Sequence, residues 1–151
     1  MLIETTVNGT PRTLDVEPSD LLLDVLRDHL GLTGAKRSCD VQVCGTCTVL
    51  LDGRPVSSCT TLAHEARGRE VLTIEGLAEL PVFARLDEVF ARHTALQCGY
   101  CTPGMALTIT SLLATGELAD DEATVREALS GNICRCTGYL AIIDAARELA
   151  R

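Results

Sequence analysis

Apolar and polar residues alternate at the start of the chain, with the period of two that a half-buried β-strand requires. The alternation covers residues 3–7 and resumes at residues 14–16, and Asn8-Gly9 between them is a strong hairpin-turn sequence. Residues 48–57 repeat the arrangement around Asp52-Gly53. The pattern therefore predicts two β-hairpins in the first half of the chain.

A helix is predicted between the two hairpins, with Ser19 as its N-cap and Gly31 as its stop. A last short strand is predicted over Val71–Ile74. These elements surround a cysteine-rich loop over residues 34–47, which is the plan of a β-grasp, ferredoxin-like domain. The apolar stripe of the helix consists of Leu22, Val25, Leu26 and Leu30.

The pattern changes to helical spacing near residues 76–81, the expected domain boundary. We therefore expect an α+β chain, with a ferredoxin-like domain over 1–76 and an all-α four-helix domain over 77–151. The apolar stripes of the four helices are assigned to the core of the bundle. They are Leu86, Val89 and Phe90; Met105, Ile109, Leu112 and Leu113; Val125, Ala128 and Leu129; and Leu140, Ile143, Ala146 and Ala150.

Composition and charge exclude several classes of function. The chain has 151 residues, of which 21 are acidic and 13 basic, and no run rich in Lys or Arg is present. A nucleic-acid-binding role is therefore not expected, because it needs a basic face. The apolar runs are too short to span a bilayer, and the start of the chain lacks the features of a secretory signal.

Eight cysteines fall into two groups, for which a disulfide scaffold, structural zinc and iron–sulfur clusters are the three candidate interpretations. A disulfide scaffold is disfavoured without a secretory signal, and structural zinc favours two regular Cys-x2-4-Cys pairs, which the second group resembles and the first does not. The spacing Cys-x4-Cys-x2-Cys with a distant fourth cysteine is that of plant-type [2Fe–2S] ferredoxins. The first group has this spacing. The groups are Cys39, Cys44, Cys47 and Cys59, and Cys98, Cys101, Cys134 and Cys136.

The second group consists of two similar cysteine pairs, each before a predicted helix. Thr102 and Thr137 follow the last cysteine of each pair and are predicted as N-caps. Two helix N-termini would then face one cluster, and their partial positive charge would offset its negative charge. Arg135 stands between two of the cysteines and is predicted to raise the potential of that cluster, because a cation favours the more negative reduced state.

Three segments carry a resemblance to a known family: GAKRSCDVQVCGTCTVLLDGRPVSSC, QCGYCTPGM and SGNICRCTGYLAI. They are similar to the two signatures of the iron–sulfur subunit of the molybdenum hydroxylases, the xanthine oxidase family. The resemblance covers nearly the whole chain and implies two [2Fe–2S] clusters, one in each domain. The sequence departs from the family pattern at Ser38 and Gln42, where glycine is usual, and at Thr46, where alanine is usual.

The resemblance also implies partners and a role. A large subunit would carry molybdopterin, a medium subunit FAD, and this chain would relay single electrons between them as a non-catalytic subunit of an oxidoreductase. Gln97 and Cys136 match family positions close to the partner's pterin. A hetero-oligomer, such as a dimer of heterotrimers, is expected, with a cytoplasmic location.

No residues of this chain are predicted to be catalytic. His29, His64 and His93 are isolated, no phosphate-binding glycine loop is present, and Asp120 to Glu122 are assigned to a helix N-terminus. Two alternatives remain at this point: a free-standing ferredoxin, which the acidic charge suits, and a zinc-binding interaction module. The sequence does not name a substrate, because the substrate pocket would lie in another chain.

Overall fold

The computed structural model describes all residues from 1 to 151. Five strands form one mixed sheet in the order β2-β1-β5-β3-β4, in which β1 and β5 are parallel and the other neighbours are antiparallel. Both predicted hairpins are confirmed. Their turns, Asn8-Gly9 and Asp52-Gly53, have positive φ at both residues, as the twist of a two-residue hairpin requires. The strands are β1 (Leu2–Val7), β2 (Thr10–Asp15), β3 (Thr48–Leu51), β4 (Arg54–Ser57) and β5 (Glu70–Leu72).

The helix between the hairpins begins later than predicted. It consists of α1 (Leu22–Asp24) and a π-helical continuation (Val25–His29), with Leu21 as the N-cap. Ser19 is therefore not the cap. It lies in a turn that the Asp20 carboxylate stabilises by accepting the N–H of Glu17 at 2.8 Å. The predicted stop at Gly31 is confirmed, since this residue has a φ of 68° just after the helix.

The last strand also ends earlier than predicted, at Leu72 instead of Ile74. Thr73 is the N-cap of a short helix, α2 (Ile74–Leu77), and its N–H donates to the Asn8 side chain at 2.9 Å. Because the first hairpin turn supplies this acceptor, the chain leaves the sheet at Thr73. A 3-10 helix over Ala63–Ala66 precedes β5.

All four predicted helices of the second half are confirmed. Asp121 caps α5, as expected for the acidic residues before it, by accepting the N–H of Thr124 at 2.9 Å. The predicted caps Thr102 and Thr137 are wrong, because Cys101 and Tyr139 hold the N-cap positions of α4 and α6. The helices are α3 (Pro81–Arg92), α4 (Thr102–Thr115), α5 (Glu122–Ala128) and α6 (Leu140–Ala150).

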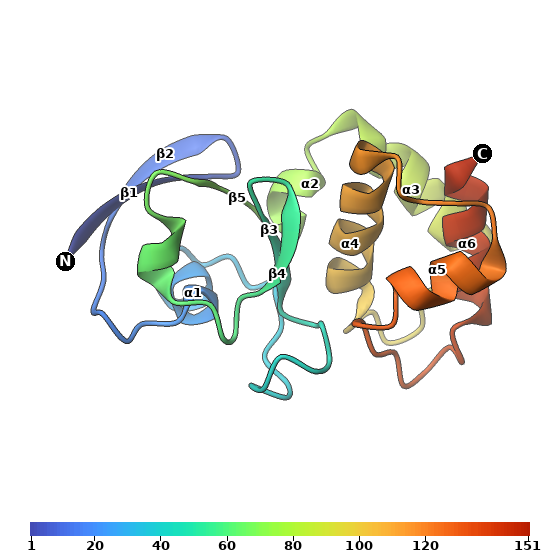
Figure 1. Cartoon of the computed structure of the whole chain (residues 1–151), viewed down its shortest axis with the longest axis horizontal. Coiled ribbons are helices and arrows are strands. Elements are labelled where there is room, and N and C mark those ends of the chain that lie inside the picture. The colour runs from blue at the N-terminus through green and yellow to red at the C-terminus, as the bar shows by residue number, and fades with distance from the viewer.

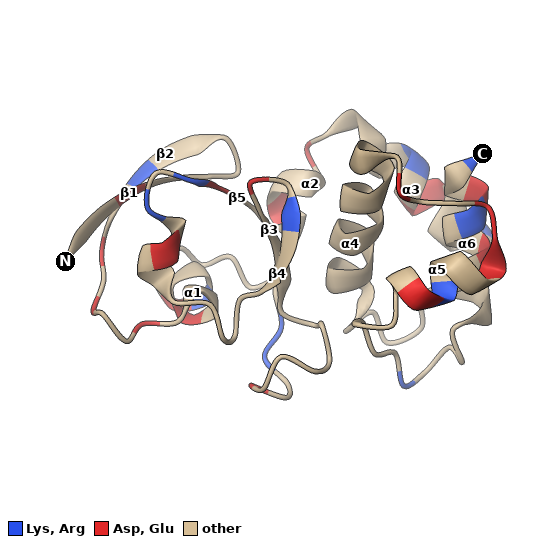
Figure 2. Cartoon of the chain, viewed as in Figure 1, with Lys and Arg blue, Asp and Glu red and all other residues tan.

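Helix α4 connects the two halves of the molecule. In Figure 1 it stands between the sheet and the other helices, where it packs against β3 on one side and α6 on the other. It carries no charged residue (Figure 2), and all residues from Gly104 to Ser111 are buried. A helix that is apolar all round is expected only where neighbours cover every face.

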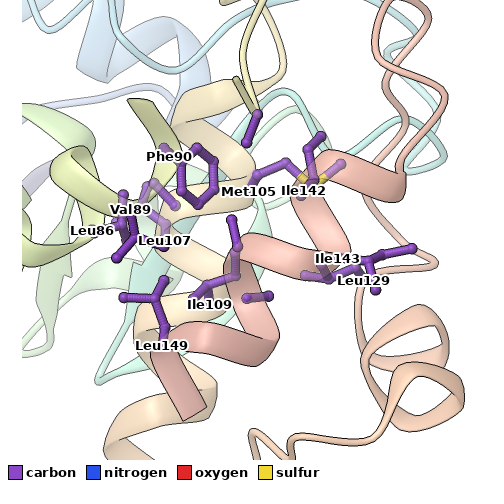
Figure 3. Packing of buried hydrophobic residues seen from close by; sticks show 14 of the residues in the cluster. Leu86, Val89, Phe90, Met105, Leu107, Ile109, Leu129, Ile142, Ile143 and Leu149 are labelled. Carbon is purple, nitrogen blue, oxygen red and sulfur yellow. The ribbon is translucent and has the colours of Figure 1, made fainter. Parts of the chain in front are cut away.

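The largest core cluster surrounds α4. Met105 and Ile109 pack with Phe90 of α3 and Leu149 of α6 (Figure 3), and the same cluster includes Leu50 of β3. Each such side chain contributes about 1.5–3 kcal/mol when fully buried. The core is therefore continuous from the helices to the sheet. No helix of the chain has the length and apolar character needed to cross a bilayer.

Candidate metal centres

The first three cysteines lie on the loop that joins the π-helical segment to β3, and Cys59 follows β4. This loop turns sharply because Asp40, Gln42 and Gly45 all have φ between 55° and 69°. Gln42 stands where the related pattern has glycine, and the left-handed conformation costs a side-chain-bearing residue about 1–2 kcal/mol. The side-chain amide oxygen of Gln42 accepts a hydrogen bond from the hydroxyl of Thr60 at 3.3 Å.

Backbone N–H groups of this loop point at sulfur. The N–H groups of Val43 and Cys44 both lie 3.4 Å from the Cys39 sulfur. Hydrogen bonds from Val41, Cys44 and Val43 lower the pKa of the Cys39 thiol to about 6, because they stabilise the thiolate. Burial has the opposite effect on Cys47, where it raises the pKa of the thiol to about 11. A metal ion bound at this position would replace the proton of the thiol.

The second group is assembled from the loop before α4 and the loop before α6. Across these loops the sulfur atoms of Cys98 and Cys136 lie 3.4 Å apart. Desolvation raises the pKa of the Cys101 thiol to about 12. Burial also raises the pKa of Cys134, but hydrogen bonds led by the Thr137 hydroxyl, 3.1 Å from the sulfur, outweigh it and leave a net lowering.

Each group has the donor set that a [2Fe–2S] cluster requires, four thiols that can bind two to each iron. Within the first group Cys39 interacts with Cys44, and Cys47 with Cys59. Within the second, Cys98 interacts with Cys136, and Cys101 with Cys134. The residues present, with N–H donors aimed at sulfur, therefore fit two clusters. The spacing predicted the first group and the resemblance implied the second, and in the structure the thiols of each group approach one another in these pairs.

The loops that carry the two groups lie on the same side of the molecule and touch one another. The cysteine loops of both halves extend along the lower edge in Figure 1. The N–H of Ile133 donates to the carbonyl oxygen of Cys44 at 2.8 Å. The hydroxyl of Tyr100 donates to the carbonyl of Arg37 at 2.5 Å. A cavity of about 180 Å³ is lined by Cys44 and by all four cysteines of the second group.

The remaining predicted site residues lie at the surface. Gln97 and Cys136 are exposed, and Arg135 is exposed beside the cavity. Arg37 differs from Arg135, because it forms ion pairs with Asp24 and Asp40 that offset its charge. The histidines do not join either group: His29 is exposed, and His93 forms a 2.7 Å pair with Glu148 of α6.

Sequence reasoning missed two residues next to the cysteines. Asn132 is buried and bonds to both halves of the molecule, and the Tyr139 hydroxyl accepts the N–H of Cys134 at 2.9 Å. Both belong to the segment SGNICRCTGYLAI, so the signal available was their proximity to Cys134 and Cys136. Their partners, however, follow only from the fold.

Comparisons with known proteins agree with this geometry. A family model described as a 2Fe-2S iron-sulfur cluster binding domain matches residues 5–74, and one described as a [2Fe-2S] binding domain matches residues 73–147. The chain therefore has a mixed α and β structure with a [2Fe–2S] ferredoxin-like fold, and it contains two cluster-binding domains. Its cofactors are two [2Fe–2S] clusters.

The relatives are subunits of oxidoreductases. The chain is 48% identical, over 92% of its length and 87% of the relative's, to the 6-hydroxypseudooxynicotine dehydrogenase complex subunit beta of Paenarthrobacter nicotinovorans. It is 41% identical to the xanthine dehydrogenase iron-sulfur-binding subunit of Escherichia coli O157:H7, with 97% and 92% covered. In the quinoline 2-oxidoreductase of Pseudomonas putida 86, a chain of 50% identity superposes with a TM-score of 0.92, with 99% and 92% covered.

The chain therefore belongs to the family of iron–sulfur subunits of the molybdenum hydroxylases, as the sequence motifs indicated. It is the electron-transfer component of a multi-subunit oxidoreductase.

Proposed function

We propose that Cys39, Cys44, Cys47 and Cys59 hold one [2Fe–2S] cluster and that Cys98, Cys101, Cys134 and Cys136 hold the other. The pairing of thiols within each group and the N–H groups directed at Cys39 and Cys98 support this ligand set. When bound, such clusters accept and release single electrons. The chain's own contribution is to hold the thiolates, to stabilise their charge with N–H donors and to keep the two sites in contact.

The observation that carries the proposal is the hydrogen bond from the Ile133 N–H to the Cys44 carbonyl, at 2.8 Å. Ile133 precedes Cys134, so this bond joins a residue of one cysteine group directly to the neighbour of a residue of the other. Two sites connected in this way suit a relay. They have no obvious use in a protein that binds zinc for structure alone.

The domain division proposed is 1–76 for the ferredoxin-like, β-grasp domain and 77–151 for the helical domain. The sheet ends at Leu72, and α2 occupies residues 74–77, which supports a boundary in this region. The four longer helices, α3 to α6, follow it. The family matches, 5–74 and 73–147, meet within a few residues of this proposed boundary.

The partners proposed are a large subunit with molybdopterin, which supplies electrons, and a medium subunit with FAD, which receives them. The relatives named as subunits of dehydrogenases support a hetero-oligomer, and a dimer of heterotrimers is the proposed assembly. Leu96, Tyr100, Ile133 and Leu140 are 43–55% exposed around the second cysteine group, where a partner would cover them. Gln97 and Cys136, exposed on the same loops, are the residues proposed to lie near the pterin.

A cytoplasmic location is proposed because cysteine thiols that bind iron stay reduced in a reducing compartment.

Single substitutions in each group test the ligand assignment. Cys47→Ala should remove one of two electron paramagnetic resonance signals and half of the iron, and Cys101→Ala should remove the other signal and the other half. Both thiols are buried to a similar degree, so each variant is a matched control for the other. The assignment is wrong if either substitution leaves all the iron in place, or removes both signals from a chain that remains folded.

A free-standing ferredoxin is the second candidate, and the excess of 21 acidic over 13 basic residues favours it. Co-expression with the genes encoded beside it, followed by size-exclusion chromatography, separates the two. A subunit should elute with a molybdenum-containing partner, whereas a carrier should elute alone with both clusters intact.

A further inference from the structure

Asn132 is a buried amide at the junction of three segments. Only 5% of the residue is exposed. Its Nδ2 donates to the carbonyl of Gly45 at 3.2 Å and lies 3.4 Å from the Thr48 hydroxyl, and its Oδ1 accepts the Thr108 hydroxyl at 3.0 Å. One side chain thus binds the first cysteine loop, β3 and α4. Both ends of the amide are paired, which is what burial of such a group requires.

The position of Asn132 in the sequence makes these contacts significant. It is two residues before Cys134, and the next residue, Ile133, donates its N–H to the carbonyl of Cys44. The amide of Asn132 binds the carbonyl of Gly45, the following residue. Two adjacent residues of one loop therefore hold two consecutive carbonyls of the other. Two such bonds fix the orientation of the loops as well as their separation.

The surrounding packing leaves little room for the loops to shift. A Cβ atom on Gly45 would lie 2.3 Å from the carbonyl oxygen of Gly131 and 2.6 Å from the Nδ2 of Asn132. A Cβ on Gly104 of α4 would lie 2.2 Å from the carbonyl oxygen of Gly45. Backbone therefore meets backbone on both sides of Gly45, and the Asn132 amide fills the remaining corner.

We propose that Asn132 is a positioning residue that fixes the Cys44 loop relative to the Cys134 loop and thereby sets the electronic coupling between the two clusters. This rests on the proposed function, since it takes Cys44 and Cys134 as ligands of different clusters. Asn132 acts through the loops, because its polar atoms bond to Gly45, Thr48 and Thr108 and to no cysteine sulfur.

Asn132 could instead affect the clusters only because it links the two halves of the chain. Ser111 provides the control for this simpler explanation. Ser111 is buried on the same helix as Thr108, and its hydroxyl donates to the carbonyl of Gly53 at 2.7 Å. This hydrogen bond also connects α4 to the first half, but it ends at the β3–β4 turn. Ser111→Ala therefore removes a link between the halves without touching either cysteine loop.

The test uses the full chain in its complex, loaded with both clusters. Asn132→Ala should retain the wild-type iron content and both resonance signals. The magnetic interaction between the two reduced clusters should weaken, and electron equilibration between them after pulsed one-electron reduction should slow severalfold. Ser111→Ala should match the wild type in both measurements. Unchanged interaction and unchanged rate in Asn132→Ala, with full iron, would overturn the proposal, as would equal effects in the two variants.

Thr108→Val provides a second variant if Asn132→Ala does not retain its clusters. It keeps the volume of the side chain and removes the hydroxyl that bonds to the Asn132 Oδ1 at 3.0 Å and to the carbonyl of Gly104, within the same helix, at 2.9 Å. The same two measurements should change in the same direction, and an unchanged result would again refute the role of Asn132. A wild-type complex that lacks two distinct resonance signals would instead contradict the proposed function itself.

Discussion

Gly45 and Gly131 are in contact across the two halves of the chain, and a Cβ atom on Gly45 would lie 2.3 Å from the carbonyl oxygen of Gly131. Gly45 also has a φ of 69°, which side-chain-bearing residues adopt at a cost. Two separate physical requirements therefore select glycine at this position. Gly53, in the β3–β4 turn, has a φ of 77° but open space around it.

A comparison of Gly45 with Gly53 distinguishes the energetic cost of backbone strain from the cost of a steric clash. Gly53→Ala should cost about 1–2 kcal/mol, the penalty for a left-handed residue. Gly45→Ala should cost clearly more, because the loops must also move apart, and iron content should fall in both cysteine groups. Urea unfolding and iron analysis of the two variants check this. Equal losses of stability would mean that the loops separate without penalty.

Arg135 should raise the reduction potential of the second cluster. The side chain is exposed beside Cys134 and Cys136, and no carboxylate of this chain forms an ion pair with it. Arg135→Ala should lower that potential by some tens of millivolts, since solvent screens much of the charge. A redox titration followed by electron paramagnetic resonance measures it. Arg126→Ala removes the same charge from an exposed side chain that does not line the cysteine cavity, and it should leave the potential unchanged.

Tyr139 should protect the second cluster more than the first. Its hydroxyl accepts the N–H of Cys134, and removing the acceptor from a partly buried donor costs about 1 kcal/mol. Tyr139→Phe should therefore lose the second cluster several times faster in the presence of an iron chelator. The resonance signal of the first cluster serves as the internal control, and parallel loss of both signals would contradict the prediction.

The cap of α5 should contribute a pH-dependent stability. The backbone N–H of Thr124, followed by its hydroxyl, lowers the pKa of the Asp121 carboxyl. Because the folded-state pKa is below the unfolded one, the stabilisation is complete above about pH 4 and is lost as the pH falls through the lowered value. Asp121→Ala should lower the thermal midpoint by a few degrees at pH 7.

Asp121→Asn is the matched control, since asparagine also caps helices but does not titrate. The wild-type advantage over this variant should shrink between pH 5 and pH 3. Thermal midpoints at several pH values measure it. An advantage that persists at the acid end would mean that the charge of Asp121 does not contribute.

The sequence predicted those elements that local chemistry determines. Asn8-Gly9 and Asp52-Gly53 define the hairpins because few other dipeptides adopt two positive φ values in succession. The spacing of Cys39, Cys44 and Cys47 predicted the first candidate cluster site because a cluster needs thiols at fixed offsets. In each case, the residues that make up the signal lie within a few positions of one another in the sequence.

The features that could not be predicted depend on residues far apart in the chain. The strand over Glu70–Leu72 ends early because Asn8 captures the N–H of Thr73, 65 residues away. Thr137 has the residue type of an N-cap, yet its hydroxyl binds the Cys134 sulfur. Asn132 appears in the sequence as one polar residue near a cysteine, and its contact with Gly45 spans 87 positions.

The buried, uncharged helix α4 also determines how the protein unfolds. Its side chains share one core with Leu50 of β3, in addition to the two smaller clusters that lie within the first half around Leu23 and Ile3. A chain cut after Leu72 would expose the face of the sheet that α4 covers, and a fragment from Ile74 onward would expose α4 itself. Separation of the two halves therefore exposes apolar surface on both of them, and this shared interface couples their unfolding in thermodynamic terms.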